Sequence, residues 1–231
     1  MVKRVGLIMI LLVLLMGPAC DKKNNPADSE ETTEGLNLLG LVNNRTLNYF
    51  QIDTVTLIPS FDIEIDSSNF TIKISGGGNN WVIKNHEQPL INLLVSNNYI
   101  LQNGFWRDIN GTDTLFYFPL PSVLMMRSFR TNTYWDDITP RLTTDTGDIR
   151  YPFYNCYFGF YYEKAYVGTE ALTLSPGEFT TYRFDVDLYL NQADSLPVAT
   201  ASEFYSPSVG LVKIVFTGQG LKRNIYLISY Q

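Results

Sequence analysis

The chain has 231 residues and a formal net charge of −6, from 17 Lys and Arg against 23 Asp and Glu. An acidic chain without a basic cluster has no electrostatic footprint for nucleic acid, so we exclude nucleic acid as a partner. One histidine and two cysteines leave too few side chains for the usual zinc sets or for a histidine-activated nucleophile. We therefore predict no metal, no cofactor and no catalytic residues, that is, a protein that is not an enzyme.

The first element in chain order is a secretory leader. Lys3 and Arg4 precede an unbroken apolar run from Val5 to Met16, and small residues then lead to Cys20. Such a run makes a helix of about 18 Å, which is too short for a hydrocarbon core of ~30 Å. The pattern predicts a signal peptide over residues 1–19 rather than a permanent membrane span.

The junction before Cys20 resembles the bacterial lipoprotein signal. In that family a diacylglycerol is attached to the cysteine thiol, and cleavage makes the cysteine the new N-terminus. The resemblance implies that Ala19 lies before the cut and that Cys20 is lipidated, which would anchor the protein to a membrane of the cell envelope through acyl chains. An ordinary signal-peptidase cut is the alternative. We prefer the outer membrane over the inner membrane.

Residues 20–35 comprise Cys20 and a stretch without any large apolar side chain. Such a composition cannot bury enough surface to offset the entropy lost on ordering. We predict a disordered tether here, followed by a single domain over residues 36–231. The best helical candidate, at 35–42, is short and carries two glycines.

The domain is dominated by strand patterns. Residues 61–66 alternate strictly between apolar and acidic, a Ser-Ser-Asn turn is predicted at 67–69, and Phe70, Ile72 and Ile74 continue the apolar face. Residues 182–190 alternate in the same way, with Tyr182, Phe184, Val186, Leu188 and Leu190 inward. Turn signals separate the strands at 75–80, 102–104, 109–111, 175–177 and 218–220. The pattern predicts an antiparallel all-β domain.

Residues 151–166, "YPFYNCYFGFYYEKAY", carry aromatic residues on both faces of the predicted strand. Either a central strand is covered by the protein itself, or the sheet offers one aromatic face to a ligand or partner. Cys156 and Lys164 share that face with the candidate ligand-facing residues Tyr154, Phe158, Phe160, Tyr162 and Tyr166.

The C-terminal segments "LTLSPGEFTTYRFDV" and "ATASEFYSPSVGLVKIVF" resemble a hairpin module of bacterial envelope lipoproteins with the pattern P-A-G-x-F … W-Y-A-P-G-V-G-L-V-K. Phe204 replaces the tryptophan of that pattern. The resemblance implies an all-β fold, a single strongly curved antiparallel sheet of the half-barrel or clam-like kind with few or no helices. That shape is loosely similar to the outer-membrane lipoprotein carrier and receptor proteins, which hold acyl chains in an apolar concavity. It implies no reaction, and we expect the matching residues to fix hairpins rather than form a site: Pro176, Gly177, Phe179, Tyr205, Pro207, Val209, Gly210, Leu211, Val212 and Lys213.

Three functions remain open. The first is a non-catalytic lipoprotein whose curved sheet binds an apolar ligand, such as an acyl chain, or a partner protein's apolar segment. The second is a structural or assembly subunit of an envelope complex, with its core filled by its own side chains. The third is a glycan-binding or glycan-cleaving domain that uses Trp81, Trp106 or Trp135 beside acidic loops. His86 and the Asp145-Thr146-Gly147 triplet are interpreted as loop residues.

Overall fold

The computed structural model describes residues 33–57, 60, 62–130, 133–138, 161–190, 192–218 and 220–231. The chain divides into two units, and all of these residues belong to the second, Thr32–Gln231. The predicted leader, Cys20 and most of the tether lie outside the described residues. The folded unit begins slightly before the predicted boundary, because strand β1 (Thr33–Glu34) pairs with β8 (Ser128–Phe129) and helix α2 (Gly35–Leu38) follows it.

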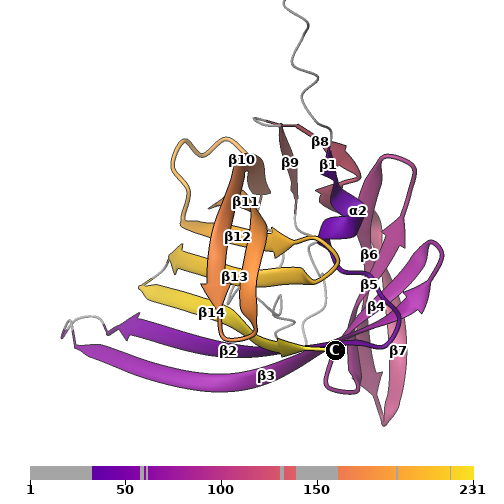
Figure 1. Ribbon diagram of the computed structural model, residues 1–231, viewed down its shortest axis with the longest axis horizontal. Helices are drawn as coiled ribbons and strands as arrows, with labels where there is room; N and C mark the ends of the chain where they lie inside the picture. The colour runs from indigo at the N-terminus through magenta and orange to yellow at the C-terminus, as the bar shows by residue number, and fades with distance from the viewer. Residues whose placement is uncertain are drawn as a thin grey trace, which may run out of the picture. The chain divides into compact units, whose positions relative to one another are not determined.

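Twelve further strands form one antiparallel sheet, which confirms the predicted fold class (Figure 1). The first six in the chain are β2 (Arg45–Thr56), β3 (Ile63–Gly77), β4 (Asn80–Asn85), β5 (Gln88–Val95), β6 (Tyr99–Ile109) and β7 (Thr112–Met126). The last six are β9 (Tyr134–Ile138), β10 (Tyr161–Leu174), β11 (Gly177–Tyr189), β12 (Ala199–Ser206), β13 (Gly210–Gly218) and β14 (Leu221–Tyr230).

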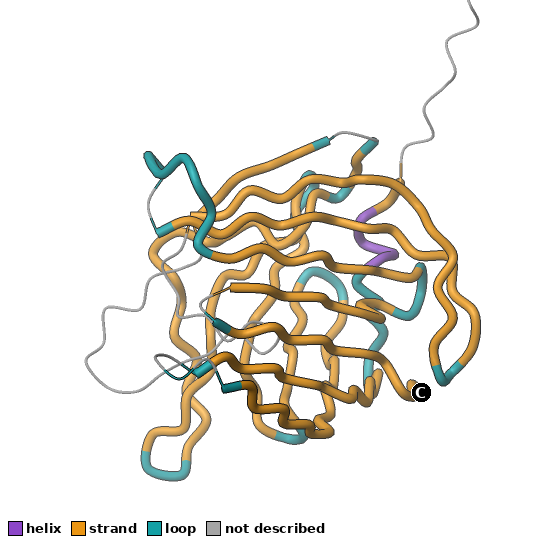
Figure 2. Tube along the Cα trace, turned by 90° about the vertical axis from the view of Figure 1, so that its left-hand side faces the viewer, coloured by secondary structure: helices purple, strands orange, loops and turns teal. Residues whose placement is uncertain are grey.

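The sheet is a meander whose first and last strands pair in its middle. Neighbours in the chain are neighbours in the sheet, and β14 pairs with β2, so that β7 and β9 are left at the two ends. Figure 2 shows the strands of the sheet running side by side, with the short helix α2 next to them. These end strands approach each other without joining in a backbone ladder. Pro119 and Pro121 lie in β7, and proline has no N–H to donate to a neighbouring strand, which suits β7 to an end position.

One face of the sheet carries the core, and we call it the inner face. Tyr49, Phe184, Ile214 and Ile225 are fully buried there, and the register places each on the same side as its neighbours across the ladders. The predicted alternation of β11 is confirmed at Phe184, Val186 and Leu188, all buried, but Leu190 is 55 % exposed because the strand ends before it.

The segment after α2 packs against the turn between β12 and β13. Ser208 donates its backbone N–H to the carbonyl of Asn37 at 2.9 Å. Gly40 has φ 58°, and a Cβ there would lie 2.2 Å from the carbonyl oxygen of Val209. Gly210 in turn has φ 112° and faces the backbone of Leu39. Two glycines are therefore required where these backbones meet.

The predicted turn at 67–69 is wrong, because β3 runs unbroken from Ile63 to Gly77. A continuous strand puts Ile63 and Ile65 on the face opposite to Ile72 and Ile74, and the first two are 67 % and 72 % exposed. The cause is the partner strand: β2 offers a full ladder as far as Thr56, and Ser and Asn extend it without a glycine or proline to stop them. The two strands thus project as an arm, which we define as residues 53–56 and 63–66 (Figure 1).

The predicted turn at 102–104 is also wrong, since these residues lie inside β6. The register between β6 and β7 shifts between Gln102 and Gly104, and a Cβ on Gly104 would lie 2.7 Å from the carbonyl oxygen of Phe116. The glycine marks a bulge with a close backbone approach rather than a hairpin. The other predicted turns, at 75–80, 109–111, 175–177 and 218–220, join consecutive strands as expected.

Candidate functional site

The candidate site lies on the inner face behind the gap between β7 and β9, which we call the seam. Side chains rather than a ladder connect its two sides. Tyr162 on β10 donates its hydroxyl proton to the carbonyl of Val123 on β7. Phe129 on β8 stacks edge-on against Tyr166, with ring centroids 4.9 Å apart. Within the described part of the chain, the seam is therefore the place where the sheet can part with the fewest hydrogen bonds broken.

Strand β10 presents Tyr162, Lys164 and Tyr166 to the inner face. The sequence alternation predicted that these three residues share one face of the strand. All three are buried, whereas Glu163 between them is exposed. Phe184 on β11 lies beside Tyr166, with centroids 5.3 Å apart, and also contacts Phe129 at 5.1 Å. These rings form a continuous aromatic layer along the inner side of the seam.

Lys164 reaches across β11 to a carboxylate two strands away. Its ammonium group donates to Oε2 of Glu203 on β12, and the Tyr205 hydroxyl donates to the same oxygen at 2.9 Å. Three rings surround the ammonium: those of Trp135, Phe184 and Tyr205, with centroids 5.7, 5.3 and 5.2 Å from Nζ. Both ion-pair side chains are almost completely buried.

Burial governs the protonation of this pair. Removal from water lowers the pKa of Lys164 to about 7. Burial also raises the pKa of Glu203 to about 8, although the hydrogen bond from Tyr205 opposes the rise. The charged and neutral forms of the pair are therefore close in free energy near neutral pH. Such a pair contributes little to stability by itself.

Trp135 adds an unsatisfied donor to this cluster. The side chain is 7 % exposed, and its Nε1–H has no hydrogen-bond acceptor among the described residues. A buried N–H left without an acceptor costs about 1–3 kcal/mol. The indole ring packs against Phe184 at 5.8 Å between centroids, in addition to its contact with Lys164. The cluster thus contains an ammonium group and an indole N–H without an acceptor in the described part of the chain, both within one aromatic enclosure.

The sequence-predicted site residues divide into three sets. Cys20, Tyr154, Cys156, Phe158 and Phe160 lie outside the described residues. Tyr162 and Tyr166 lie in the cluster just described. The motif residues lie in two hairpins. In the first, Pro176 and Gly177 form the β10–β11 turn, and Phe179 is buried on β11. In the second, Pro207 and Gly210 lie at the β12–β13 turn, Tyr205 is buried beside Glu203, and Lys213 lies on the outer face with Nζ 4.9 Å from the Phe204 ring.

The sequence reasoning did not single out Lys164, Glu203 or Trp135. A signal for Lys164 was available, since the period-two alternation places the residue on the same face of the strand as the aromatic side chains. Glu203 likewise alternates in step with Ala199, Ala201 and Tyr205 along β12, which predicts that the four share a face. No pattern could show that the two groups meet, because this depends on the register across β11.

Other chemistry weighed from the sequence has no support in its surroundings. His86 lies at the exposed turn between β4 and β5 with φ 52°. Trp81 and Trp135 are buried, and Trp81 donates Nε1–H to the carbonyl of Gly78 at 3.1 Å, so neither presents a ring to a sugar. Residues 143–148 lie outside the described residues. Within the part of the chain that the structure describes, no group of three or more His, Cys, Asp and Glu side chains could hold a metal ion.

An open pocket of about 400 Å³ lies where the chain enters the folded unit. Its lining is largely polar and separate from the aromatic layer: Glu34, Asn97, Asn98, Tyr99, Met126, Arg127 and Ser128. Arg127 is held there by a hydrogen bond from Nη1 to the carbonyl of Ser96 at 3.2 Å. No helix among the described residues is both long and apolar enough to cross a membrane.

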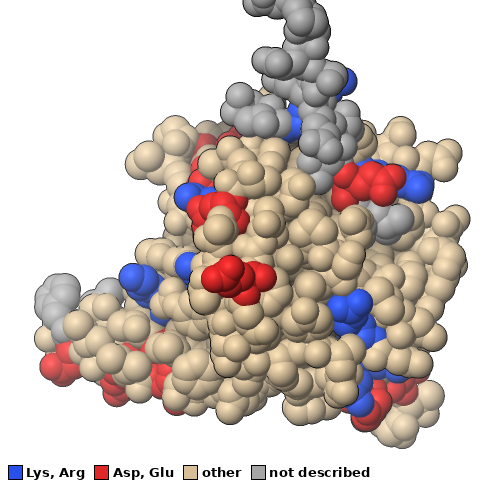
Figure 3. Space-filling model, viewed as in Figure 1, with Lys and Arg blue, Asp and Glu red and all other residues tan. Residues whose placement is uncertain are grey.

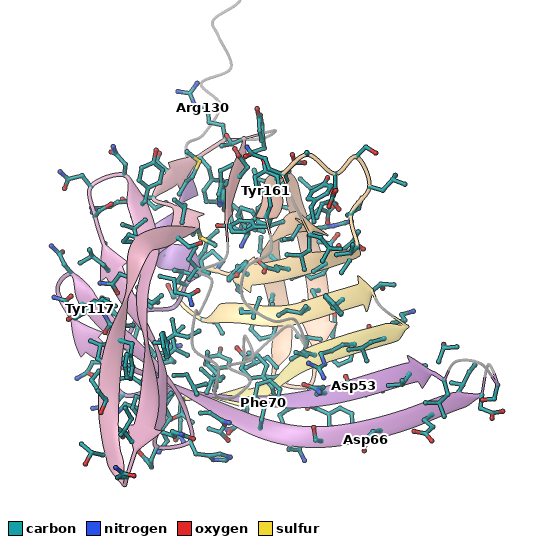
Figure 4. The ribbon with its side chains drawn as sticks, turned by 180° about the vertical axis from the view of Figure 1, so that it is seen from behind. Asp53, Asp66, Phe70, Tyr117, Arg130 and Tyr161 are labelled. Atoms are coloured by element: carbon teal, nitrogen blue, oxygen red, sulfur yellow. The ribbon has the colours of Figure 1, made fainter. Side chains whose placement is uncertain are left out.

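Charge is distributed unevenly over the surface. Acidic side chains gather along the β2–β3 arm (Figure 3), where Asp62, Glu64 and Asp66 are exposed. Figure 4 shows Asp53 and Asp66 along this arm and Phe70 nearer its base, while Tyr161 lies at the opposite side of the sheet. Tyr161 donates its hydroxyl proton to Oδ2 of Asp136 at 2.8 Å, and this bond raises the pKa of the phenol to about 12.

No family model and no curated protein matches the chain. Three solved structures are similar to it over most of its length at low identity. A protein described as exported, with a YmcC-like fold, from Bacteroides fragilis is 9 % identical, with a TM-score of 0.36 over 84 % of this chain and 98 % of that one. A protein described as a lipoprotein, from Parabacteroides distasonis, is 14 % identical, with a TM-score of 0.36 over 84 % of this chain and 98 % of that one.

The third similar structure is a β-barrel-like protein of unknown function from Brucella abortus. It is 6 % identical, with a TM-score of 0.43 over 83 % of this chain and 98 % of that one. At these identities and TM-scores the likenesses assign neither a family nor a function to the chain.

Proposed function

We propose that this chain is a non-catalytic lipoprotein, anchored to the cell envelope through Cys20, whose inner aromatic face binds an apolar ligand. The anchor rests on the leader and its junction with Cys20. We place the protein at the outer membrane in preference to the inner membrane. The domain would stand clear of the headgroups on its acidic tether.

The observation that carries the ligand site is the seam. The two end strands approach each other without a ladder, and Tyr162 and Tyr166 lie directly behind the gap. Among the described residues, parting the seam breaks the Tyr162–Val123 hydrogen bond and ring contacts, whereas opening any other pair of neighbouring strands breaks a ladder of backbone bonds. An apolar chain that entered here would exchange those ring contacts for its own, and each buried CH₂ would contribute about 0.8 kcal/mol.

Native mass spectrometry tests the proposal. Every described strand and the described core lie in Thr32–Gln231, so the chain from Asp21 onward can be purified without its leader. We expect a co-purifying apolar molecule, or uptake of an added fatty acid at one per chain. A clean apo mass that stays unchanged with added fatty acid would contradict the ligand site. A mature product from the native host that lacks acyl groups would contradict the anchor.

A second function is favoured by the packing of the same residues. Tyr162 and Tyr166 are already covered, and the arm displays Ile63 and Ile65 to solvent. A core filled by its own side chains, together with an exposed apolar arm, suits a structural or assembly subunit of an envelope complex. The mass experiment separates the two functions, because an assembly subunit takes up no ligand.

A further inference from the structure

The cluster behind the seam contains more polar groups than an apolar ligand requires. Lys164 and Glu203 are almost fully buried, although burying two charges costs several kcal/mol for each ion. Apolar side chains of similar size would fill the same space without that cost. The cluster therefore needs an explanation other than packing.

We infer that Lys164 and Trp135 form the head-group site for a single-chain amphiphile with a carboxylate head, that is, a long-chain fatty acid. This inference rests on the ligand site proposed above and specifies its substrate class. It requires an anion next to Lys164 and an apolar tail along the inner face.

The donors in the cluster point to an anion. Lys164 offers an ammonium group, and Trp135 offers an N–H that has no acceptor among the described residues. A carboxylate has two oxygens, so a single head group can accept from both donors. Charged hydrogen bonds of this kind are about twice as strong as neutral ones.

Glu203 can release Lys164 to such a ligand. The Tyr205 hydroxyl holds the same carboxylate oxygen that Lys164 contacts, at 2.9 Å, so Glu203 keeps a partner after Lys164 leaves. Burial raises its pKa, which favours the protonated side chain when no cation is beside it. A protonated Glu203 can also donate its own proton to the ligand carboxylate.

The remainder of the inner face is suited to a hydrocarbon tail. The ladders from β10 to β13 place five buried apolar side chains next to the cluster on the same face: Val186, Leu188, Ala199, Ala201 and Phe216. Tyr162 and Tyr166 flank Lys164 on β10 and lead to the seam. The head would therefore bind within the aromatic enclosure and the tail would lie along β11 and β12.

Binding measurements with three lipids test the inference. The chain from Asp21 is titrated in a calorimeter, below the critical micelle concentration, with oleate, methyl oleate and oleoyl-lysophosphatidate. The first two share the same tail and differ in head-group charge. We expect oleate to bind at least tenfold more tightly than methyl oleate, and we expect lysophosphatidate to bind more weakly than oleate because its head is larger.

Variants identify the residues. Lys164→Met should remove the preference for oleate over its ester, and Trp135→Phe, which keeps an aromatic ring without the N–H, should reduce it. Lys213→Met is the matched control, because this lysine lies against the Phe204 ring on the outer face. It should leave the preference unchanged. Near-ultraviolet circular dichroism shows whether each variant keeps its packed aromatic core.

The outcomes separate the two proposals. Equal affinity for oleate and methyl oleate, or a preference that survives in Lys164→Met, overturns the head-group site but leaves the apolar ligand site standing. Tighter binding of lysophosphatidate than of oleate overturns the carboxylate assignment. Failure of all three lipids to bind overturns the proposed function itself. If Lys164→Met does not fold, the test rests on Trp135→Phe, in which an undiminished preference for oleate over methyl oleate overturns the head-group site.

Discussion

Among the described residues, two ion pairs lie on the inner face, and they differ in burial, geometry and number of hydrogen bonds. Arg223 on β14 and Asp53 on β2 are direct cross-strand partners, and two parallel hydrogen bonds of 2.7 and 2.5 Å join the guanidinium to the carboxylate. Their side chains are 12 % and 18 % exposed, so water still reaches them. This pair needs no role beyond fixing the register at the base of the arm.

Lys164 and Glu203 are separated by a strand, are buried, and share a single oxygen contact beside an unsatisfied indole. Water does not offset the desolvation of this pair, and Lys164 and Glu203 are joined by a single hydrogen bond rather than by two parallel ones. The contrast shows that ion pairs on one face can serve different ends. The accessible bidentate pair is explained by structure, whereas the enclosed pair is the basis of the proposed head-group site.

Removing the phenyl ring beside each ion pair should have the largest effect on the free energy of unfolding. Phe184→Ala and Phe216→Ala both delete a buried phenyl group, and each should lower the free energy of unfolding by about 3–5 kcal/mol. Phe216 is the matched control, since the register places it opposite Arg223. Phe184→Ala alone should admit water to Lys164 and raise its pKa, as measured by NMR titration of the lysine Cε–H signals. An unchanged Lys164 pKa in that variant would contradict the desolvated state of the cluster.

Neutralising the enclosed pair should stabilise the protein. In Lys164→Met/Glu203→Gln both ionisable groups are gone, while the glutamine can still accept from Tyr205. We expect a gain of about 1–4 kcal/mol near neutral pH in denaturant unfolding, because the cost of burying the charges disappears. A loss of stability of similar size would mean that the pair holds the fold together.

The pH dependence of wild-type stability should show the same effect. Between pH about 7 and 10.5 the unfolded chain binds a proton at Lys164 that the folded protein does not, so stability falls as the pH is lowered through this range. Between pH 4.5 and about 8 the folded protein keeps a proton on Glu203, so stability falls as the pH is raised. Both penalties apply between pH about 7 and about 8, where we expect the stability of the wild type, relative to that of the double variant, to be lowest. A maximum there would identify a stabilising ion pair.

Breaking the accessible pair should destabilise the protein, and the change in the free energy of unfolding should be smaller. Asp53→Asn keeps the shape of the side chain but removes the charge that accepts both bonds from Arg223. We expect the free energy of unfolding to fall by about 1–2 kcal/mol. A double-mutant cycle with Arg223→Met isolates the pair, and a coupling energy near zero would show that the register does not depend on it.

The outer face of the arm should matter least to stability. Ile63→Ser and Ile65→Ser change side chains that are mostly exposed, so unfolding should shift by no more than about 0.5 kcal/mol. Ile72→Ala, on the same strand but buried, should cost about 2–5 kcal/mol. A large loss from the exposed pair would mean that the arm packs against something in solution, which size-exclusion chromatography would reveal as an oligomer.

The sequence predicted the parts of this fold that depend on local alternation. Period-two patterns identified β11 and showed that Tyr162, Lys164 and Tyr166 share one face of their strand. They misassigned β3, because the apolar positions change from odd to even residue numbers between Ile65 and Phe70. Such a change can arise either from a turn or from a strand that extends beyond the core. The choice depends on how far β2 extends opposite it, which is not local information.

The candidate site was only half predictable for a related reason. Its aromatic half follows from one strand, whereas the pairing of Lys164 with Glu203 requires the register of three strands. The seam has a local signal in Pro119 and Pro121, because a strand with two prolines lacks backbone donors for a second neighbouring strand and suits the end of a sheet. The identity of the facing strand follows only from the closure of β14 on β2.

The most direct test of the central claim is carbon NMR of oleate labelled at its carboxyl carbon and bound to the chain from Asp21. The account predicts one bound resonance whose carboxylate stays ionised to a lower pH than free oleate, because Lys164 and Trp135 stabilise the anion. In Lys164→Met the resonance should titrate as the free fatty acid does. A bound signal with the same titration in both proteins, or no bound signal at all, would contradict the account.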